Sequence, residues 1–240
     1  QYKPSIIARP SLQQQPPEQQ QQNQKQEDKQ DSTDGVQEGP WIMTFDDFLT
    51  DEECNTMIQL AGVEGFHRSV DVGPIQEDGT VQGVETKDRT SFNSWCMDEC
   101  YHDPIAQRIM ERIQNITHVP ETNYEHFQLL RYYPGQFYRE HHDFIRQHKM
   151  LQHGPRVLTF FLYLNDVEEG GGTRFTNLDI TVEPKKGKGL LWPSVLDDYP
   201  RAMDPRTNHE ALPVLKGIKY GANAWLHMRD FKTPHRTGCA

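Results

Sequence analysis

The chain has 240 residues and a formal net charge of −10, with 35 acidic against 25 basic side chains. Nucleic-acid binding relies on clustered Lys and Arg that contact phosphates, so this charge argues against a nucleic-acid partner. No apolar run approaches the roughly 18 residues of a membrane-spanning helix, and we expect no membrane segment within this fragment.

The first 40 residues differ in composition from the rest. From residue 11 to residue 40 the large apolar residues are Leu12 and Val36, among Gln, Glu, Asp, Asn and Pro. Such a segment buries too little apolar surface to offset the entropy lost on ordering, so residues 1–40 are predicted to be a disordered, Gln-rich tail or linker. Residues 41–240 are long enough for one domain with a substantial core. Because the chain begins with Gln1, we expect a fragment, from which a signal or anchor could have been cut away.

Cysteine usage favours an oxidising compartment. The cysteines Cys54, Cys96, Cys100 and Cys239 lack the C-x-x-C spacing of zinc sites. Their even number permits two disulfides, and a bridge between Cys54 and Cys239 could tie the first predicted helix to the C-terminus. Together with a glycosylation sequon at residues 115–117, this pattern points to the secretory pathway.

Two helices are predicted in the first half, after a short strand over residues 41–48. A capping box at residues 50–53 opens the first helix, which ends near Gly62. Residues 70–88 are polar and glycine-punctuated, so we interpret them as a mobile loop that could serve as a lid. A strand over residues 89–95 follows. The second helix starts at Asp103-Pro104, and its apolar face consists of Ile105, Ile109, Met110, Ile113 and Ile116.

The second half of the chain has the period-two pattern of β-strands. Glycine and proline separate the strand-like runs, which cover residues 127–133, 136–144, 157–165, 173–176, 180–183, 189–192, 211–218 and 223–227. Many short strands at this spacing indicate a β-sandwich or jelly roll. The predicted fold class is therefore α+β but mainly β, with the two N-terminal helices packed on a sheet as supports.

The segment 131–143 carries the candidate metal ligands. In a strand, side chains alternate between faces, so His141 and Asp143 point the same way and His142 points oppositely, as a structural or surface residue. An imidazole and a carboxylate on one face supply two ligands of a facial metal site, and His209 is the candidate third. Two histidines and one carboxylate leave neighbouring positions open, which suits Fe(II) oxygenases. By itself, a His-x-Asp pair is also typical of a polar surface strand.

Lys219 is a candidate anion-binding residue. It lies ten positions after His209, in Gly217-Ile218-Lys219. A lysine that points into a narrow barrel is costly unless it meets an anion. Without that context, the pattern favours an ordinary lysine on an edge strand.

Several motifs in the second half stand in a characteristic order. They are Tyr132…Gln136-x-Tyr138-x-x-His141-x-Asp143, Arg156-Val157-Leu158-Thr159, Tyr163-Leu164-Asn165, Gly171-Gly172-Thr173-x-Phe175, the distal His209, Pro213-Val214, Gly217-x-Lys219 and Trp225-Leu226-His227. Together they resemble the prolyl 4-hydroxylases of the Fe(II)- and 2-oxoglutarate-dependent dioxygenase superfamily. The match extends over nearly everything from Trp41 onward and includes Arg89-Thr90-Ser91. A lysine at position 219 resembles the collagen and plant cell-wall branch more than the oxygen-sensing branch.

The resemblance implies a double-stranded β-helix (jelly roll) and a set of cofactors. Fe(II) would be held by His141, Asp143 and His209. The cosubstrate 2-oxoglutarate would pair its distal carboxylate with Lys219, which Tyr132 and Thr173 would assist through their hydroxyls. Ascorbate would be the reductant that restores the iron after uncoupled turnover.

The resemblance also implies contacts with a polyproline II peptide. The candidates are Tyr138, Arg156, Trp225 and His227, because aromatic rings and an arginine donor complement proline rings and free carbonyls. Each has a structural alternative: Tyr138 and Trp225 as core aromatics, Arg156 as a salt-bridge former, and His227 as a histidine at the rim.

The predicted function is peptidyl-proline 4-hydroxylation of proline-rich or collagen-like polypeptides. Dioxygen and 2-oxoglutarate would be consumed, and succinate and CO2 released. The alternatives are a dioxygenase of the same superfamily that acts on another residue or a small molecule, and a catalytically silent jelly-roll binding module. The expected location is the lumen of the endoplasmic reticulum, and the sequence leaves the oligomeric state open.

Overall fold

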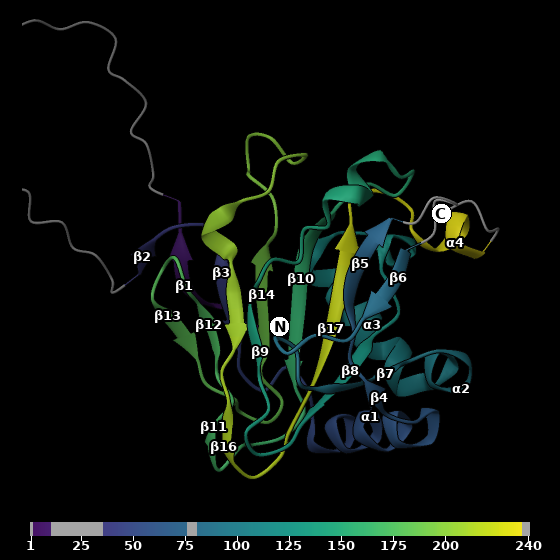
Figure 1. The fold of residues 1–240 in the computed structure, drawn as a ribbon, viewed down its shortest axis with the longest axis vertical. Coiled ribbons are helices and arrows are strands. Elements are labelled where there is room, and N and C mark those ends of the chain that lie inside the picture. Colours follow the sequence, from purple (N-terminus) through teal and green to yellow (C-terminus); the bar gives the residue numbers. More distant parts are fainter. Residues whose placement is uncertain (1, 11–35, 76–80, 237–240) are drawn as a thin grey trace, which may run out of the picture.

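The computed structural model describes residues 2–10, 36–75 and 81–236, and within it two β-sheets face each other (Figure 1). The larger sheet has nine strands, in the spatial order β2 (Gln37–Glu38), β1 (Ser5–Arg9), β3 (Ile42–Phe45), β14 (Gly189–Pro193), β10 (Arg156–Tyr163), β17 (Lys219–His227), β8 (Gln128–Tyr132), β7 (Phe92–Trp95) and β4 (His67–Arg68). The smaller sheet has four, in the order β13 (Ile180–Val182), β12 (Thr173–Phe175), β15 (His209–Ala211) and β9 (Tyr138–His141).

Short hairpins and helices complete the fold. The two-stranded pairs are β11 (Glu169–Gly170) with β16 (Val214–Lys216), and β5 (Asp71–Ile75) with β6 (Val81–Val84). The helices are α1 (Asp51–Glu64), α2 (Asp98–His102), α3 (Pro104–Thr117) and α4 (Lys232–Arg236), with 3-10 turns η1 (Glu121–Asn123), η2 (Arg146–Met150) and η3 (Pro205–Thr207). In the part of the chain so described, no helix combines the length and apolarity of a membrane span.

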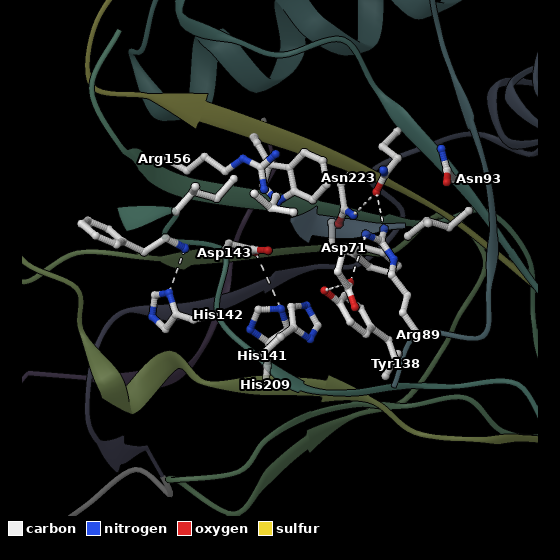
Figure 2. A pocket seen from close by; sticks show the side chains of 18 of the residues that line it. Asp71, Arg89, Asn93, Tyr138, His141, His142, Asp143, Arg156, His209 and Asn223 are labelled. Atoms are coloured by element: carbon white, nitrogen blue, oxygen red, sulfur yellow. Dashed lines mark hydrogen bonds and ion pairs between the residues drawn. The ribbon is translucent and has the colours of Figure 1, made fainter. Parts of the chain in front are cut away.

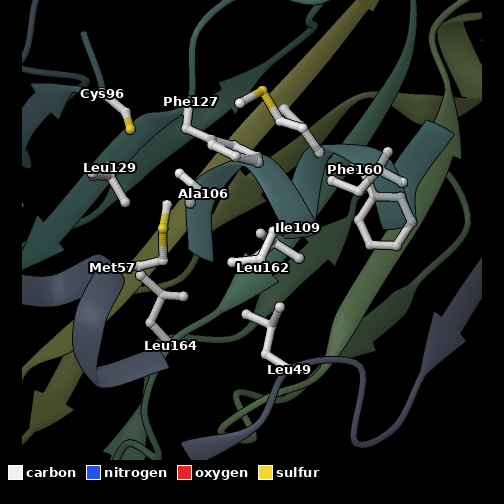
Figure 3. Close-up of a cluster of buried hydrophobic side chains, with 14 of the residues drawn as sticks. Leu49, Met57, Cys96, Ala106, Ile109, Phe127, Leu129, Phe160, Leu162 and Leu164 are labelled. Carbon is white, nitrogen blue, oxygen red and sulfur yellow. The ribbon is translucent and has the colours of Figure 1, made fainter. Parts of the chain in front are cut away.

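The central strand β10 separates two hydrophobic cores. Its side chains alternate, so Phe161 and Tyr163 pack between the two sheets. Phe160 and Leu162 point to the other face, where they meet residues of α1 and α3 such as Met57 and Ile109 (Figure 3). The predicted class, a mainly β jelly roll with supporting N-terminal helices, is confirmed.

The predicted strands of the second half coincide with observed strands, except that one predicted run is divided between two strands. The run 211–218 divides into the end of β15 and the strand β16, because Pro213 lacks the N–H that a continuous ladder needs. Strand β17 starts at Lys219 rather than later, and Lys219 pairs there with Tyr132 of β8. Both side chains are buried, at 1% and 2% exposure. The short helix α2 was not predicted.

The N-terminal boundary of the domain differs from the prediction. Ser5–Arg9 forms β1, which pairs antiparallel with β3, and Gln37–Glu38 pairs with β1. The apolar run Ile6-Ile7-Ala8 explains this strand, since Ala8 is fully buried. The predicted tail over residues 1–40 was therefore too broad at both of its ends, and its central part, residues 11–35, lies outside the described residues.

The segment predicted as a mobile loop contains the hairpin β5–β6. Gly73 permits its close pairing, because a Cβ at this position would lie 2.2 Å from the backbone oxygen of Gln82. The glycines that suggested flexibility thus include one required by strand packing. Residues 76–80 of the predicted lid lie outside the described residues.

The disulfide in the structure joins Cys96 to Cys100, at the end of β7 and within α2. Cys54 is buried on α1 as a free thiol, in contrast to the predicted bridge to Cys239. Cys239 itself lies outside the described residues.

The capping box of α1 is present as predicted. The Thr50 hydroxyl accepts the N–H of Glu53 at 3.2 Å, and the Glu53 carboxylate accepts the N–H of Thr50 at 3.0 Å. We expect Thr50→Ala to lower the free energy of unfolding by about 1 kcal/mol, because an orphan helix amide loses its acceptor. Thr50→Ser keeps the hydroxyl and should unfold close to the parent. Urea denaturation of the three proteins tests this, and equal midpoints for Thr50→Ala and the parent would contradict it.

Candidate metal and 2-oxoglutarate site

The structure brings the three predicted metal ligands together. His141 ends β9, Asp143 follows two residues later, and His209 opens β15, directly opposite His141 in the antiparallel pair. One candidate ligand atom from each residue lies within 4.8 Å of the others. His209 Nε2 is 3.7 Å from Asp143 Oδ2, and the two imidazole centroids are 4.4 Å apart (Figure 2).

Hydrogen bonds outside the triad orient each of these side chains. His141 Nδ1 lies 2.8 Å from the carbonyl oxygen of Arg139, and His209 Nδ1 lies 2.9 Å from that of Thr207. A carbonyl can only accept, so each Nδ1 carries the proton and each Nε2 has its lone pair free for a metal. The Thr159 hydroxyl donates to Asp143 Oδ2 at 2.6 Å and fixes the carboxylate.

The electrostatics of the triad favour metal-binding protonation states. Burial lowers the pKa of His141, and the neighbouring His209 lowers it further, so the imidazole is neutral near pH 7. Although burial opposes ionisation of Asp143, His209 and His141 lower the pKa of this carboxyl. Two imidazoles and one carboxylate are a donor set that fits Fe(II).

Lys219 places a buried ammonium in the same cavity. Its Nζ donates to the Gly171 carbonyl at 2.6 Å and lies 5.3 to 5.4 Å from the ring centroids of Tyr132, Phe161 and Tyr163. Among the described residues no carboxylate forms a salt bridge with it. Burial lowers the pKa of Lys219 to about 7. An unneutralised cation in an aromatic enclosure is a site for an anion such as the distal carboxylate of 2-oxoglutarate.

The two hydroxyl residues predicted to assist Lys219 line the same cavity. Tyr132 is the register partner of Lys219, and Thr173 lines the cavity from β12. The Thr173 hydroxyl accepts a hydrogen bond of 2.8 Å from Tyr163, a phenol that the sequence analysis did not assign to the site. Tyr163 belongs to the motif Tyr163-Leu164-Asn165, which contributed to the family resemblance, but the sequence alone assigned no role to this residue.

The cavity has a volume of about 560 Å³ and joins the metal triad, Lys219 and three of the four predicted peptide contacts. Tyr138 stacks on His141 with centroids 3.6 Å apart, and its hydroxyl donates to Asp71 Oδ1 at 2.9 Å. The Arg156 guanidinium lies 3.6 Å from the ring centroid of Trp225. Within the described structure the buried Trp225 Nε1 has no hydrogen-bond partner.

His227 does not line this cavity. It is 0% exposed and bonds through Nε2 to Glu125 Oε1 at 2.8 Å. Glu125 in turn receives Arg156 through Nε at 2.5 Å and Nη2 at 2.9 Å. The peptide contact predicted for His227 is therefore corrected to a supporting position behind Glu125 and Arg156. His142 lines the cavity but does not belong to the triad, and its Nε2 lies 2.9 Å from the Asp204 carbonyl oxygen and 3.0 Å from the Thr207 hydroxyl.

Sequence reasoning missed a second polar group at the cavity wall. Arg89 donates to the Gln128 side chain at 2.9 Å and to the Val70 carbonyl at 2.8 Å. Its guanidinium also lies 4.6 Å from the Tyr138 ring centroid, and Figure 2 shows it beside Asp71 and Asn223. Arg89-Thr90-Ser91 was part of the family resemblance and could have drawn attention to Arg89. No local feature of the sequence, however, indicates that Arg89 contacts Tyr138.

Comparisons with known proteins agree with this geometry. A sequence model of the 2OG-Fe(II) oxygenase superfamily matches residues 127–227, which include the whole triad. Prolyl 4-hydroxylase 1 of Arabidopsis thaliana is 34% identical over 209 residues, covering 81% of this chain and 71% of the relative. Prolyl 4-hydroxylase subunit alpha-1 of Gallus gallus is 34% identical over 219 residues, which are 82% of this chain but only 39% of that subunit.

A solved structure extends the likeness to three dimensions. The viral collagen prolyl hydroxylase from Paramecium Bursaria Chlorella virus-1, in its 2OG complex, aligns with a TM-score of 0.60 and 28% identity, over 78% of this chain and 94% of that chain. Fold and site thus define an Fe(II)- and 2-oxoglutarate-dependent dioxygenase. Within that class, the chain belongs to the prolyl 4-hydroxylase family.

The hydrogen bond from Thr159 to Asp143 gives a test of the metal site. Thr159→Val removes the donor with little change in shape, and we expect Fe(II) or Mn(II) affinity to fall about 10- to 100-fold. Thr159→Ser keeps the hydroxyl and should bind metal like the parent. Anaerobic calorimetric titration measures both, and unchanged affinity in Thr159→Val would contradict the assignment.

Lys219 predicts a pH dependence of 2-oxoglutarate binding. A carboxylate partner raises the lysine pKa above its value of about 7 in the free site. The contribution of the Lys219 charge to 2-oxoglutarate binding is therefore complete below pH 7, and it is lost as the pH rises through the lysine pKa of the complex. We expect the Kd, measured calorimetrically with saturating Mn(II), to rise up to about tenfold per pH unit above pH 7, with proton uptake on binding.

Lys219→Arg is the matched control for this slope. An arginine stays charged throughout the range, so its Kd should be nearly independent of pH even if its absolute affinity differs. The same slope in Lys219→Arg and the parent would show that another group is responsible.

Proposed function

We propose that this protein hydroxylates C4 of proline in proline-rich or collagen-like polypeptides. The observation that carries the proposal is the joint placement of a His-His-Asp set, in which Asp143 and His209 are buried, and an unneutralised buried lysine in one open cavity with an aromatic wall. The relatives named above add the reaction class, and His141, Asp143 and His209 are proposed to hold the iron.

The cofactor supplies the oxidation chemistry. Bound Fe(II), with 2-oxoglutarate and dioxygen, supports hydroxylation of an unactivated C–H bond while the 2-oxo acid is converted to succinate and CO2. The protein contributes position and shielding. Lys219 anchors one end of 2-oxoglutarate so that its 2-oxo acid end reaches the triad. Tyr138, stacked on His141, together with the apolar rings near Lys219, keeps water away from the reacting atoms.

The substrate wall of the cavity suits a peptide with few backbone donors. Arg156 uses Nε and Nη2 on Glu125, and in the described structure its Nη1 has no hydrogen-bond partner. A polyproline II strand offers exposed carbonyls that accept such a donor, and Trp225 offers an indole N–H and a ring face. We therefore propose Tyr138, Arg156 and Trp225 as peptide contacts, with His227 as a residue that positions Glu125.

Ascorbate as reductant and the endoplasmic reticulum lumen as location are further parts of the proposal. A disulfide between Cys96 and Cys100 supports an oxidising compartment, where such bonds persist. Asn115 of the sequon is exposed on α3, which is compatible with glycan attachment.

Mass spectrometry of model peptides tests the proposed function. With Fe(II), 2-oxoglutarate and ascorbate, we expect collagen-like or hydroxyproline-rich peptides to gain one oxygen on proline. His209→Ala should abolish the gain, because the metal loses a ligand. Unmodified peptides with continued conversion of 2-oxoglutarate would favour a dioxygenase with another substrate, and absence of both reactions would favour a silent binding module.

A further inference from the structure

A second histidine cluster lies outside the triad. His148 comes from η2, His153 from the loop that follows, and His227 from the end of β17. One ring nitrogen of each lies within 4.8 Å of the others, and the ring centroids are 4.4 to 5.5 Å apart. His153 and His227 are 2% and 0% exposed, whereas His148 is half-buried. No carboxylate belongs to this cluster of candidate ligands.

The carboxylate of Glu125 fixes the protonation of His227. Although burial opposes its ionisation, Arg156 and the hydrogen bond with His227 lower the pKa of Glu125. The ionised carboxylate accepts from His227 Nε2 at 2.8 Å, so Nε2 carries a proton. In a neutral imidazole the lone pair is then on Nδ1, which faces the cluster. In metal sites, the ring nitrogen of a histidine that does not bind the metal commonly donates its N–H to a carboxylate in the same way.

Electron-rich atoms converge around His227 Nδ1. His153 Nδ1 lies 2.9 Å away and the Gly154 carbonyl oxygen 2.8 Å away, and His153 Nδ1 is itself 2.7 Å from that oxygen. Three atoms that can each offer a lone pair stand within 3 Å of one another. Only a shared proton or a cation makes such a convergence favourable.

His148 completes the cluster with an available nitrogen. Within the described structure its Nδ1 is buried without a hydrogen-bond partner. Burial, with Arg156 and His227, lowers the pKa of His148 to about 3, so the imidazole is neutral near pH 7. The aromatic ring of Phe231 stacks on His227, with centroids 4.7 Å apart, and shields the cluster on one side.

We propose that His148, His153 and His227 form a second metal site, for zinc or a similar divalent d-block ion. Three imidazoles without a carboxylate suit zinc, copper, nickel or cobalt rather than magnesium or calcium. Bonds of about 2.0–2.1 Å to zinc need ligand atoms about 3.3 Å apart. His153 Nδ1 and His227 Nδ1, now 2.9 Å apart, would separate slightly on binding, and the ring of His148 would rotate to bring its nitrogen to the same ion. The Gly154 carbonyl or a water completes the coordination.

The position of the cluster gives this site a structural consequence. Arg146 and Gln147 line the substrate cavity from η2, and His148 is the next residue along the chain. Glu125 joins His227 to Arg156 on the cavity wall. A metal held by the three histidines therefore fastens η2 to β17 and steadies Arg156, which faces the proposed peptide.

The test counts zinc on the full chain. The metal-free protein should bind two equivalents of zinc, one at the iron triad and one at the histidine cluster. His148→Ala should retain one equivalent, with the other weakened at least about 100-fold, and His209→Ala should also retain one. His67→Ala, on the exposed strand β4, is the surface control and should keep two. Calorimetry with elemental analysis gives the counts, and circular dichroism checks folding.

Glu125→Gln and cobalt provide independent readouts. Glu125→Gln should weaken the second equivalent about 10- to 100-fold, because the carboxylate behind His227 is lost. Co(II) at the cluster should give visible ligand-field absorption in His209→Ala that vanishes when His148→Ala is added. One equivalent in the parent, or two in His148→Ala, would overturn the proposal and leave the cluster as a proton-sharing structural network. If His148→Ala does not fold, the parent count and the cobalt spectrum of His209→Ala decide.

Discussion

The antiparallel pairing of β9 with β15 holds the active site together. Its register sets His209 opposite His141, and the chain leaving β9 brings Asp143 to the same point. Each imidazole is then turned by a carbonyl only two residues away, at Arg139 and Thr207. The ligand geometry is therefore a property of one strand pair and its flanking backbone. A register shift of either strand by one residue would move one histidine to the other face of the sheet and separate the candidate metal ligands.

Two cations, the buried Lys219 and the partly buried Arg156, have unlike surroundings in the cavity. Lys219 has no carboxylate partner among the described residues, so its end of the cavity attracts an anion. Arg156 is neutralised by Glu125 and stacked on Trp225, so its end offers hydrogen-bond donors and ring surface without net charge. In the proposed roles, the Lys219 end binds the dianionic cosubstrate and the Arg156 end faces the uncharged peptide backbone, with the metal triad in the same cavity. The difference in charge between the two ends favours this assignment of ligands.

Much of this was accessible from the sequence, because the signals were local or followed a strand period. The capping box of Thr50 and Glu53 predicts a helix start, and the spacing of His141 and Asp143 places them on one strand face. The strand pattern of the second half is also regular. Contacts between residues far apart in the sequence could not be predicted from it. Nothing local places His227 behind Glu125, 102 positions away. Likewise the apolar Ile6-Ile7 pair was outweighed by the polar composition of the segment that follows it.

We propose that His141, Asp143 and His209 hold Fe(II) while Lys219 holds 2-oxoglutarate in the same cavity. The most direct measurement is the visible charge-transfer absorption that appears when a 2-oxo acid chelates Fe(II) in the absence of oxygen. We expect this band in the parent, its loss in His209→Ala, and its appearance only at much higher 2-oxoglutarate concentration in Lys219→Met. A band that neither substitution affects would contradict these assignments.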